Sequence, residues 1–87
     1  MSMKVKQPPI PEGYLRIGPA AERLSLSRQT IEYYLLLGVV EPCRIEGRHG
    51  RFFDDELLEQ IKTVRALNKA GYTLRDIREM FLKQGEQ

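Results

Sequence analysis

The segment SLSRQTIEYYLLLG, residues 25–38, decides the fold. Ser27 marks a helix start, because its hydroxyl can accept a hydrogen bond from a backbone N–H two or three residues further along the chain. Ile31 and Tyr34 follow at helical spacing on one face. Gly38 is expected to end this helix, since glycine takes the left-handed conformation at little cost. The segment therefore predicts a short helix with a well-defined start and end.

Another short helix is expected immediately upstream. It is expected to start near Gly18-Pro19, because proline is tolerated at the first helical position, where the N–H that it lacks would have no partner. Ala20 and Leu24 belong to a short apolar stripe, and the helix is expected to end near Ser25. Only Ser25 and Leu26 then separate the two helices. Two short helices with so tight a connection predict a helix-turn-helix.

Downstream of Gly38 the pattern stops being helical. Pro42 opens this part, and residues 44–45 and 51–53 are predicted to form two short strands around a turn at 46–50 that contains two glycines. An isolated hairpin is marginally stable in water, so this one is expected to rest on the helices. Residues 44–53 are called the wing below.

Two longer helices are expected after the wing. Asp54 can cap the first of them, and Gly71 is expected to stop it. Thr73 then begins a capping-box pattern for the last helix. Apolar residues recur at i, i+3 and i+4 spacing in both, namely Leu57, Leu58, Ile61, Val64 and Leu67, then Leu74, Ile77 and Phe81.

The predicted fold is therefore mainly α: a winged helix-turn-helix with four helices and a small two-stranded β-hairpin, over residues 14–84. Residues 1–13 are expected to be a flexible N-terminal arm, because Pro8, Pro9 and Pro11 disfavour both helix and central strand.

Composition argues against several classes of protein. The chain has 87 residues, of which 41% are hydrophobic and 30% charged, as expected of one small soluble domain. Its single cysteine, Cys43, and single histidine, His49, are too few for a disulfide or a zinc site, so no metal and no cofactor is expected. Glycine-rich phosphate loops are missing too, and the carboxylates mostly sit at helix starts, so an enzyme is not expected. Neither a membrane segment nor a signal peptide is visible, and the predicted location is cytoplasmic.

The distribution of charge points to DNA more than the net charge of +2 does. The second helix of a helix-turn-helix enters the major groove with its first residues toward the bases. Arginine can pair with guanine and glutamine with adenine, while hydroxyl groups can bond phosphates. Arginine on the wing suits the backbone or a narrow minor groove. The predicted DNA-binding residues are Ser27, Arg28, Gln29, Thr30, Glu32 and Tyr33 on the helix, and Arg44, Arg48, His49 and Arg51 on the wing.

Each of these positions also admits a purely structural role. Ser27 can act as a cap alone, and Arg28 and Gln29 can be ordinary solvated side chains. Arg51 can pack over an aromatic ring or hold the hairpin down, a role nearly as well supported as DNA contact. Aromatic residues at core spacing are expected to pack, whereas the faces of Tyr33, Phe52 and Tyr72 are left open.

The ordered set of motifs resembles the DNA-binding domain of MerR-type transcription regulators. The resemblance runs from about Tyr14 to Leu82 and implies a recognition helix at 27–37 and family DNA contacts at Arg28, Tyr33, Arg51 and nearby wing residues. The motifs that carry it are Ile17-Gly18, Leu26-Ser27, Thr30-Ile31-Glu32-Tyr33-Tyr34, Gly38-Val39-Val40-Glu41-Pro42, Gly50-Arg51-Phe52-Phe53 and Gly71-Tyr72-Thr73-Leu74-Arg75-Asp76-Ile77.

The sequence departs from the family pattern in three ways. Glu32 stands where the family usually has arginine, and its carboxylate repels phosphate although it can accept from cytosine N4. Gly50 and Phe53 stand where tyrosines are common. The family's long dimerisation helix and effector domain do not follow Gln87, which predicts either an excised domain or a minimal regulator, in both cases without a small-molecule effector site.

Three functions remain open at this stage. The leading one is a sequence-specific transcription regulator, or its DNA-binding domain, acting on double-stranded DNA as a homodimer or a tandem assembly. The second is an excisionase-like architectural protein that binds and bends DNA. The third is a protein-interaction module like the chaperone modulators, which Glu32 keeps open. Convergence of Arg28, Arg48 and Arg51 on one face would favour DNA.

Overall fold

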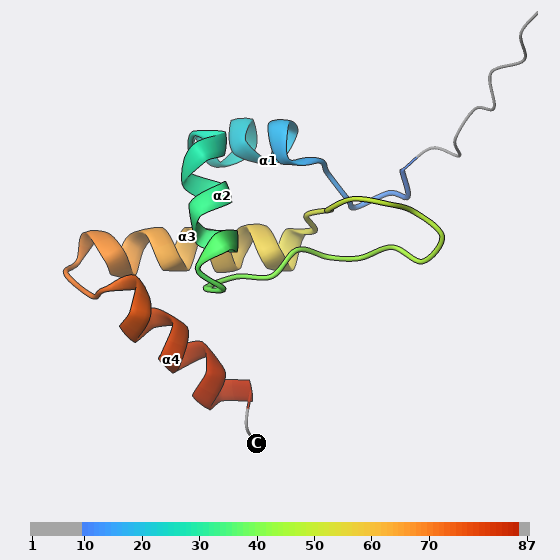
Figure 1. Ribbon diagram of the computed structural model, residues 1–87. Coiled ribbons are helices and arrows are strands. Elements are labelled where there is room, and N and C mark those ends of the chain that lie inside the picture. The colour runs from blue at the N-terminus through green and yellow to red at the C-terminus, as the bar shows by residue number, and fades with distance from the viewer. Residues whose placement is uncertain (1–9, 86–87) are drawn as a thin grey trace, which may run out of the picture.

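Four helices make up most of the computed structural model, which describes residues 10–85. In chain order they are α1 (Ile17–Leu24), α2 (Arg28–Leu36), α3 (Asp55–Lys69) and α4 (Leu74–Gly85). The two short helices α1 and α2 lie over one side of the long α3, and α4 leads away from the end of α3 (Figure 1). The prediction of a mainly helical fold with four helices is confirmed.

The helix-turn-helix is built by local hydrogen bonds. Ser25 adopts the left-handed conformation with φ 55°, and its N–H bonds back to the Glu22 carbonyl. Ser27 caps α2 as expected: its Oγ accepts from the Thr30 N–H at 3.0 Å. One strained residue and one side-chain cap thus turn the chain from α1 into α2 within three residues.

The two later helices start at the predicted caps. Asp54 Oδ1 accepts from the Leu57 N–H at 2.8 Å, and Thr73 Oγ1 accepts from the Asp76 N–H at 3.0 Å. Both side chains satisfy backbone donors that have no partner inside the helix.

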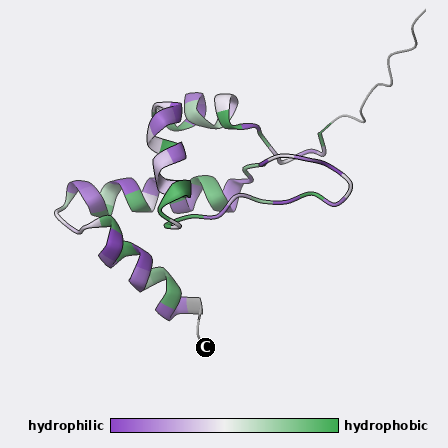
Figure 2. Ribbon diagram, in the orientation of Figure 1, coloured by the Kyte–Doolittle hydropathy of each residue, from purple (hydrophilic) through white to green (hydrophobic). Residues whose placement is uncertain are grey.

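The core lies where α1, α2 and α4 meet α3. Helices in Figure 2 carry apolar residues on one face and polar residues on the other, as expected for helices that cover a shared core. Phe53 from the end of the wing is fully buried in this cluster. Its helical members are Ile17, Ala20, Ala21, Ile31, Tyr34, Leu57, Leu58, Ile61, Val64 and Ile77.

The wing differs from its prediction, because the described residues contain no regular strand. Cys43 and Phe52 form one antiparallel bridge, with N–H to carbonyl distances of 2.8 and 3.1 Å. A further bridge pairs Phe53 with Leu15, which precedes α1. Gly50 has φ +107°, outside the range of an extended strand, so the ladder stops after the Cys43–Phe52 pair. The expected two-stranded hairpin is thereby reduced to isolated bridges.

The expected flexible arm falls mostly outside the described residues, which begin at Ile10. Close to that start, the Tyr14 N–H donates to the Pro11 carbonyl at 3.3 Å across a turn. Within residues 10–85, none of the helices has both the length and the apolar character that a bilayer span requires.

Candidate nucleic-acid interface

The first turn of α2 presents polar side chains to the surface. Ser27, Arg28 and Gln29 are exposed, and Tyr33 one turn later is 52% exposed. The buried side of the same helix carries Ile31 and Tyr34, which fix it against the core. Four of the residues predicted for DNA contact therefore share the solvent side of a well-anchored helix.

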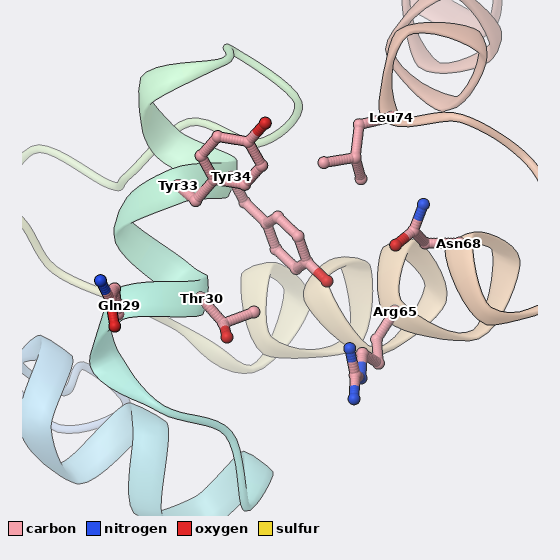
Figure 3. A pocket seen from close by; sticks show the side chains of 7 residues that line it. All are labelled: Gln29, Thr30, Tyr33, Tyr34, Arg65, Asn68 and Leu74. Atoms are coloured by element: carbon pink, nitrogen blue, oxygen red, sulfur yellow. The ribbon is translucent and has the colours of Figure 1, made fainter.

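A hollow of about 370 Å³ separates this face of α2 from α3. Figure 3 shows the ring of Tyr34 directed toward the part of α3 that carries Arg65 and Asn68. Arg65 and Asn68 were not predicted as site residues. The available signal was their helical spacing after Ile61, at i+4 and i+7, which places them on the edge of the buried stripe of α3. The hollow is lined by Gln29, Thr30, Tyr33, Tyr34, Arg65, Asn68 and Leu74.

Glu32 and Arg51 form a bidentate ion pair between α2 and the wing. Arg51 Nη1 donates to Glu32 Oε1 at 2.7 Å, and Nη2 donates to Oε2 at 2.9 Å. These hydrogen bonds hold the pKa of the Glu32 carboxyl below its ordinary value, with the charges of Arg51 and Arg28 acting in the same direction. They also raise the pKa of Arg51. Arg51 therefore holds the wing against α2 and also lies at the surface. Its position agrees with both roles predicted for it, a structural one and contact with DNA.

The other predicted wing residues, Arg44, Arg48 and His49, differ in their contacts and in their exposure. Arg44 is exposed, and its Nη1 donates to the Gly50 carbonyl at 3.1 Å, so the guanidinium braces the turn at the surface. The Arg48 N–H donates to the Ile45 carbonyl at 3.0 Å, and the Arg48 side chain is half-buried. His49 is exposed, and its carbonyl accepts from Arg16.

Arg16 is a basic residue of this surface that sequence reasoning missed. Its guanidinium carbon lies 4.3 Å from the centroid of the Phe52 ring, and Nη1 donates to the His49 carbonyl at 3.4 Å. Tyr14 meets the same ring edge-on, with centroids 6.5 Å apart. Phe52, whose face was left open, is therefore fully buried under two residues that precede α1. No local pattern signals a contact across 33 residues of chain.

Three arginines from separate segments line one surface hollow of about 460 Å³. We call it the arginine hollow; its lining residues are Arg16, Ile17, Gly18, Arg28, Gly50 and Arg51. Convergence of Arg28, Arg48 and Arg51 on one face was expected to favour DNA. Arg28 and Arg51 both line this hollow, whereas Arg48 does not. A concave surface with several guanidinium groups suits an anionic partner.

The described residues offer no comparable arrangement for chemistry on a metal. No group of three or more histidine, cysteine, aspartate or glutamate side chains within residues 10–85 is placed to hold a metal ion. Burial raises the pKa of the Cys43 thiol above its ordinary value, so a smaller fraction of this thiol is present as the reactive thiolate.

Comparison with protein families gives a match over nearly all of the described chain. The model described as "MerR HTH family regulatory protein" matches residues 15–84. The chain belongs to this MerR family. The matched residues include all of the motifs that carried the family resemblance in the sequence, from Ile17-Gly18 to the segment 71–77.

Relatives of this MerR domain are named as regulators. The chain is 32% identical over 69 residues to the uncharacterised HTH-type transcriptional regulator YyaN of Bacillus subtilis, covering 79% of this chain and 49% of that protein. It is 30% identical over 63 residues to the mercuric resistance operon regulatory protein of Bacillus cereus, covering 71% and 47%. The chain thus spans about half the length of these curated relatives.

A solved structure shares the fold. A MerR-family transcriptional regulator from Bacillus cereus superposes with a TM-score of 0.67 at 20% identity, over 79% of this chain and 52% of that one. At that identity the likeness concerns the fold alone.

Proposed function

We propose that this MerR domain is a sequence-specific DNA-binding regulator of transcription, or the DNA-binding part of one. The observation that carries the proposal is the arginine hollow beside the exposed first turn of α2. In this arrangement α2 enters the major groove, and the wing lies over the backbone or the minor groove. The names of its relatives, regulators of transcription, support the same conclusion.

Different side chains of α2 serve the bases and the backbone. Gln29 at the start of α2 reads a base edge, because its amide group matches adenine, whereas Arg28 lines the arginine hollow and binds the DNA backbone. Ser27 and Thr30 engage phosphate oxygens, with Arg65 across the α2–α3 hollow as an additional cation. Phosphate contacts set the register of the helix, and base contacts set the sequence.

Fluorescence anisotropy of a labelled duplex of mixed sequence, titrated at several salt concentrations, tests DNA binding. The logarithm of the association constant should fall linearly with that of the salt concentration, by about 0.9 for each phosphate neutralised. Arg28→Ala should weaken binding and make the slope shallower. Lys83→Ala, an equal change of charge in the last turn of α4, should alter neither, because α4 lies on the opposite side of α3 from α1 (Figure 1).

Selection from a randomised duplex pool then tests sequence specificity. A recurrent motif, bound more tightly than a scrambled duplex at the same salt, supports the regulator. Binding without a motif, several copies to one long duplex and with bending, would instead support the architectural alternative. Absence of binding even at low salt would leave the protein-interaction alternative.

A further inference from the structure

The Glu32–Arg51 pair joins two elements of the proposed DNA-binding face. Glu32 lies on α2 and Arg51 on the wing, 19 residues apart in the chain. The side chains are 44% and 36% exposed, respectively, so the pair lies at the surface. Paired charges at such exposure add little to folding stability, because water and salt screen them. A contribution to folding stability therefore does little to explain why Glu32 and Arg51 are paired.

Simple electrostatics also argues against a carboxylate here. A negative charge beside the arginine hollow lowers the attraction of this surface for phosphate. The bidentate geometry has a compensating effect, because it fixes the plane of the Arg51 guanidinium. A guanidinium group carries five N–H donors, and two of them serve Glu32. Three remain for another acceptor.

The other two cations of the arginine hollow come from separate elements. Arg16 is held by the Phe52 ring and the His49 carbonyl, and Arg28 stands on the first turn of α2. Arg51 alone has its orientation fixed by a carboxylate on the recognition helix. A preorganised donor binds more tightly than a mobile one, because its side chain loses less freedom on binding.

We propose that Glu32 is a positioning residue for DNA: it holds Arg51 so that Arg16, Arg28 and Arg51 together bind one phosphate group of the DNA backbone in the arginine hollow. The inference rests on the proposed DNA-binding function and names a site within it. Glu32 itself touches no DNA. It couples the wing to α2, so that phosphate binding in the hollow and base contact by α2 occur in one fixed register.

If Glu32 positions Arg51, its removal should change DNA affinity in the direction opposite to the one that charge alone predicts. Removing a carboxylate from a DNA-binding surface should strengthen binding if the carboxylate only repels phosphate. If Glu32 positions Arg51, its removal should weaken binding despite the gain of one positive unit of net charge. Glu22 provides the matched control, because it is an exposed glutamate on α1 without an ion pair among the described side chains.

The experiment is a double-mutant cycle on duplex affinity, with the duplex and salt series described above. Wild type, Glu32→Ala, Arg51→Ala and the double variant are compared, with Glu22→Ala alongside. Circular dichroism and thermal melting confirm that each variant is folded. We expect Glu32→Ala to weaken binding roughly three- to tenfold and to lower the salt slope by about 0.9, the loss of one phosphate contact. Glu22→Ala should leave affinity equal or slightly higher.

The double-mutant cycle shows whether Glu32 affects DNA affinity through Arg51 or independently of it. In the Arg51→Ala background, Glu32→Ala should no longer weaken binding and should strengthen it slightly, since only the repulsion remains to be lost. Tighter binding of Glu32→Ala in both backgrounds overturns the proposal and leaves DNA binding intact. Equal weakening in both backgrounds also overturns it, because Glu32 would then act without Arg51. Failure of the wild type to bind removes the proposed function and this inference together.

Discussion

Arg16 lies over the ring of Phe52, with its guanidinium carbon 4.3 Å from the ring centroid. Phe52 is fully buried but does not belong to the main core, which its neighbour Phe53 enters. Successive side chains of an extended segment point to opposite faces, so the two phenylalanines serve different neighbours. Phe53 fastens the wing to the helices, and Phe52 fastens it to the residues before α1.

Gly50 makes this contact possible, and its substitution should reveal it. A Cβ at Gly50 would overlap Arg16 Nη1, and the residue has φ +107°. We expect Gly50→Ala to lower the free energy of unfolding by more than the cost of positive φ alone, which is about 1–2 kcal/mol. Urea denaturation measures the loss.

Gly47→Ala is the control for that experiment. Gly47 also has positive φ, at +80°, but a Cβ there meets nothing within 4 Å. Its substitution should cost about 1–2 kcal/mol from the backbone alone. Equal losses for the two variants would mean that the Arg16 contact adds nothing.

The contribution of Glu32 to stability should depend on pH. Its pKa in the folded protein lies below the ordinary 4.5, because Arg51 bonds the charged form. The stabilisation is therefore fully present above 4.5 and is lost as the pH falls through the lower folded-state value. Denaturation of wild type and Glu32→Gln across this range should show their difference shrinking toward acid. A difference that stays constant with pH would contradict the pairing.

Ser27 combines a capping role with a place on the proposed DNA-binding face, and two substitutions separate them. Ser27→Ala removes the acceptor for the Thr30 N–H and should cost about 1 kcal/mol of folding free energy. Ser27→Asp keeps an acceptor at the helix N-terminus and should retain stability. The new carboxylate faces phosphate, so the Asp variant should bind duplex DNA more weakly than the Ala variant. The reverse order of affinities would remove Ser27 from the interface.

Ser25 carries the backbone strain of the helix-turn-helix. Its φ of 55° is one that a residue with a side chain rarely adopts. Ser25→Gly should raise the free energy of unfolding by up to about 1 kcal/mol, since relief of strain exceeds the entropy that glycine loses on folding. Ser25→Ala keeps the Cβ and should bring no gain. A gain in both variants would point to the hydroxyl rather than the backbone.

The helices were predictable because their signals are local. Ser27, Asp54 and Thr73 were expected as caps, and each accepts from the backbone N–H three residues later. A cap involves only atoms within one turn, so its geometry follows from neighbouring residue types. The apolar stripe of α3 was predicted in the same way, and four of its members are buried.

The wing and the site were only partly predictable. Two glycines correctly indicated a turn, but the positive φ of Gly50 interrupts the ladder that the pattern suggested. The residues proposed for α2 lie at the surface as a helical face requires, and Arg44, although exposed, uses its guanidinium to brace the turn of the wing. Arg16 and Arg65 were missed, because each joins the surface only through packing of its element against another.

The sequence by itself determined the order and the buried faces of the four helices, since periodicity acts over a few residues. It also determined the starts of α2, α3 and α4, which have side-chain caps, whereas α1 begins at Ile17, before the expected Gly18-Pro19, without such a cap. The tertiary structure alone decided which arginines share a hollow and that Glu32 meets Arg51. The Glu32–Arg51 pair joins residues 19 positions apart, and the Arg16–His49 hydrogen bond joins residues 33 positions apart. Both form only after helix packing has fixed the distance between the segments. Charge counting alone predicts that the Glu32 carboxylate opposes DNA binding, whereas in the folded protein this carboxylate pairs with Arg51 of the wing.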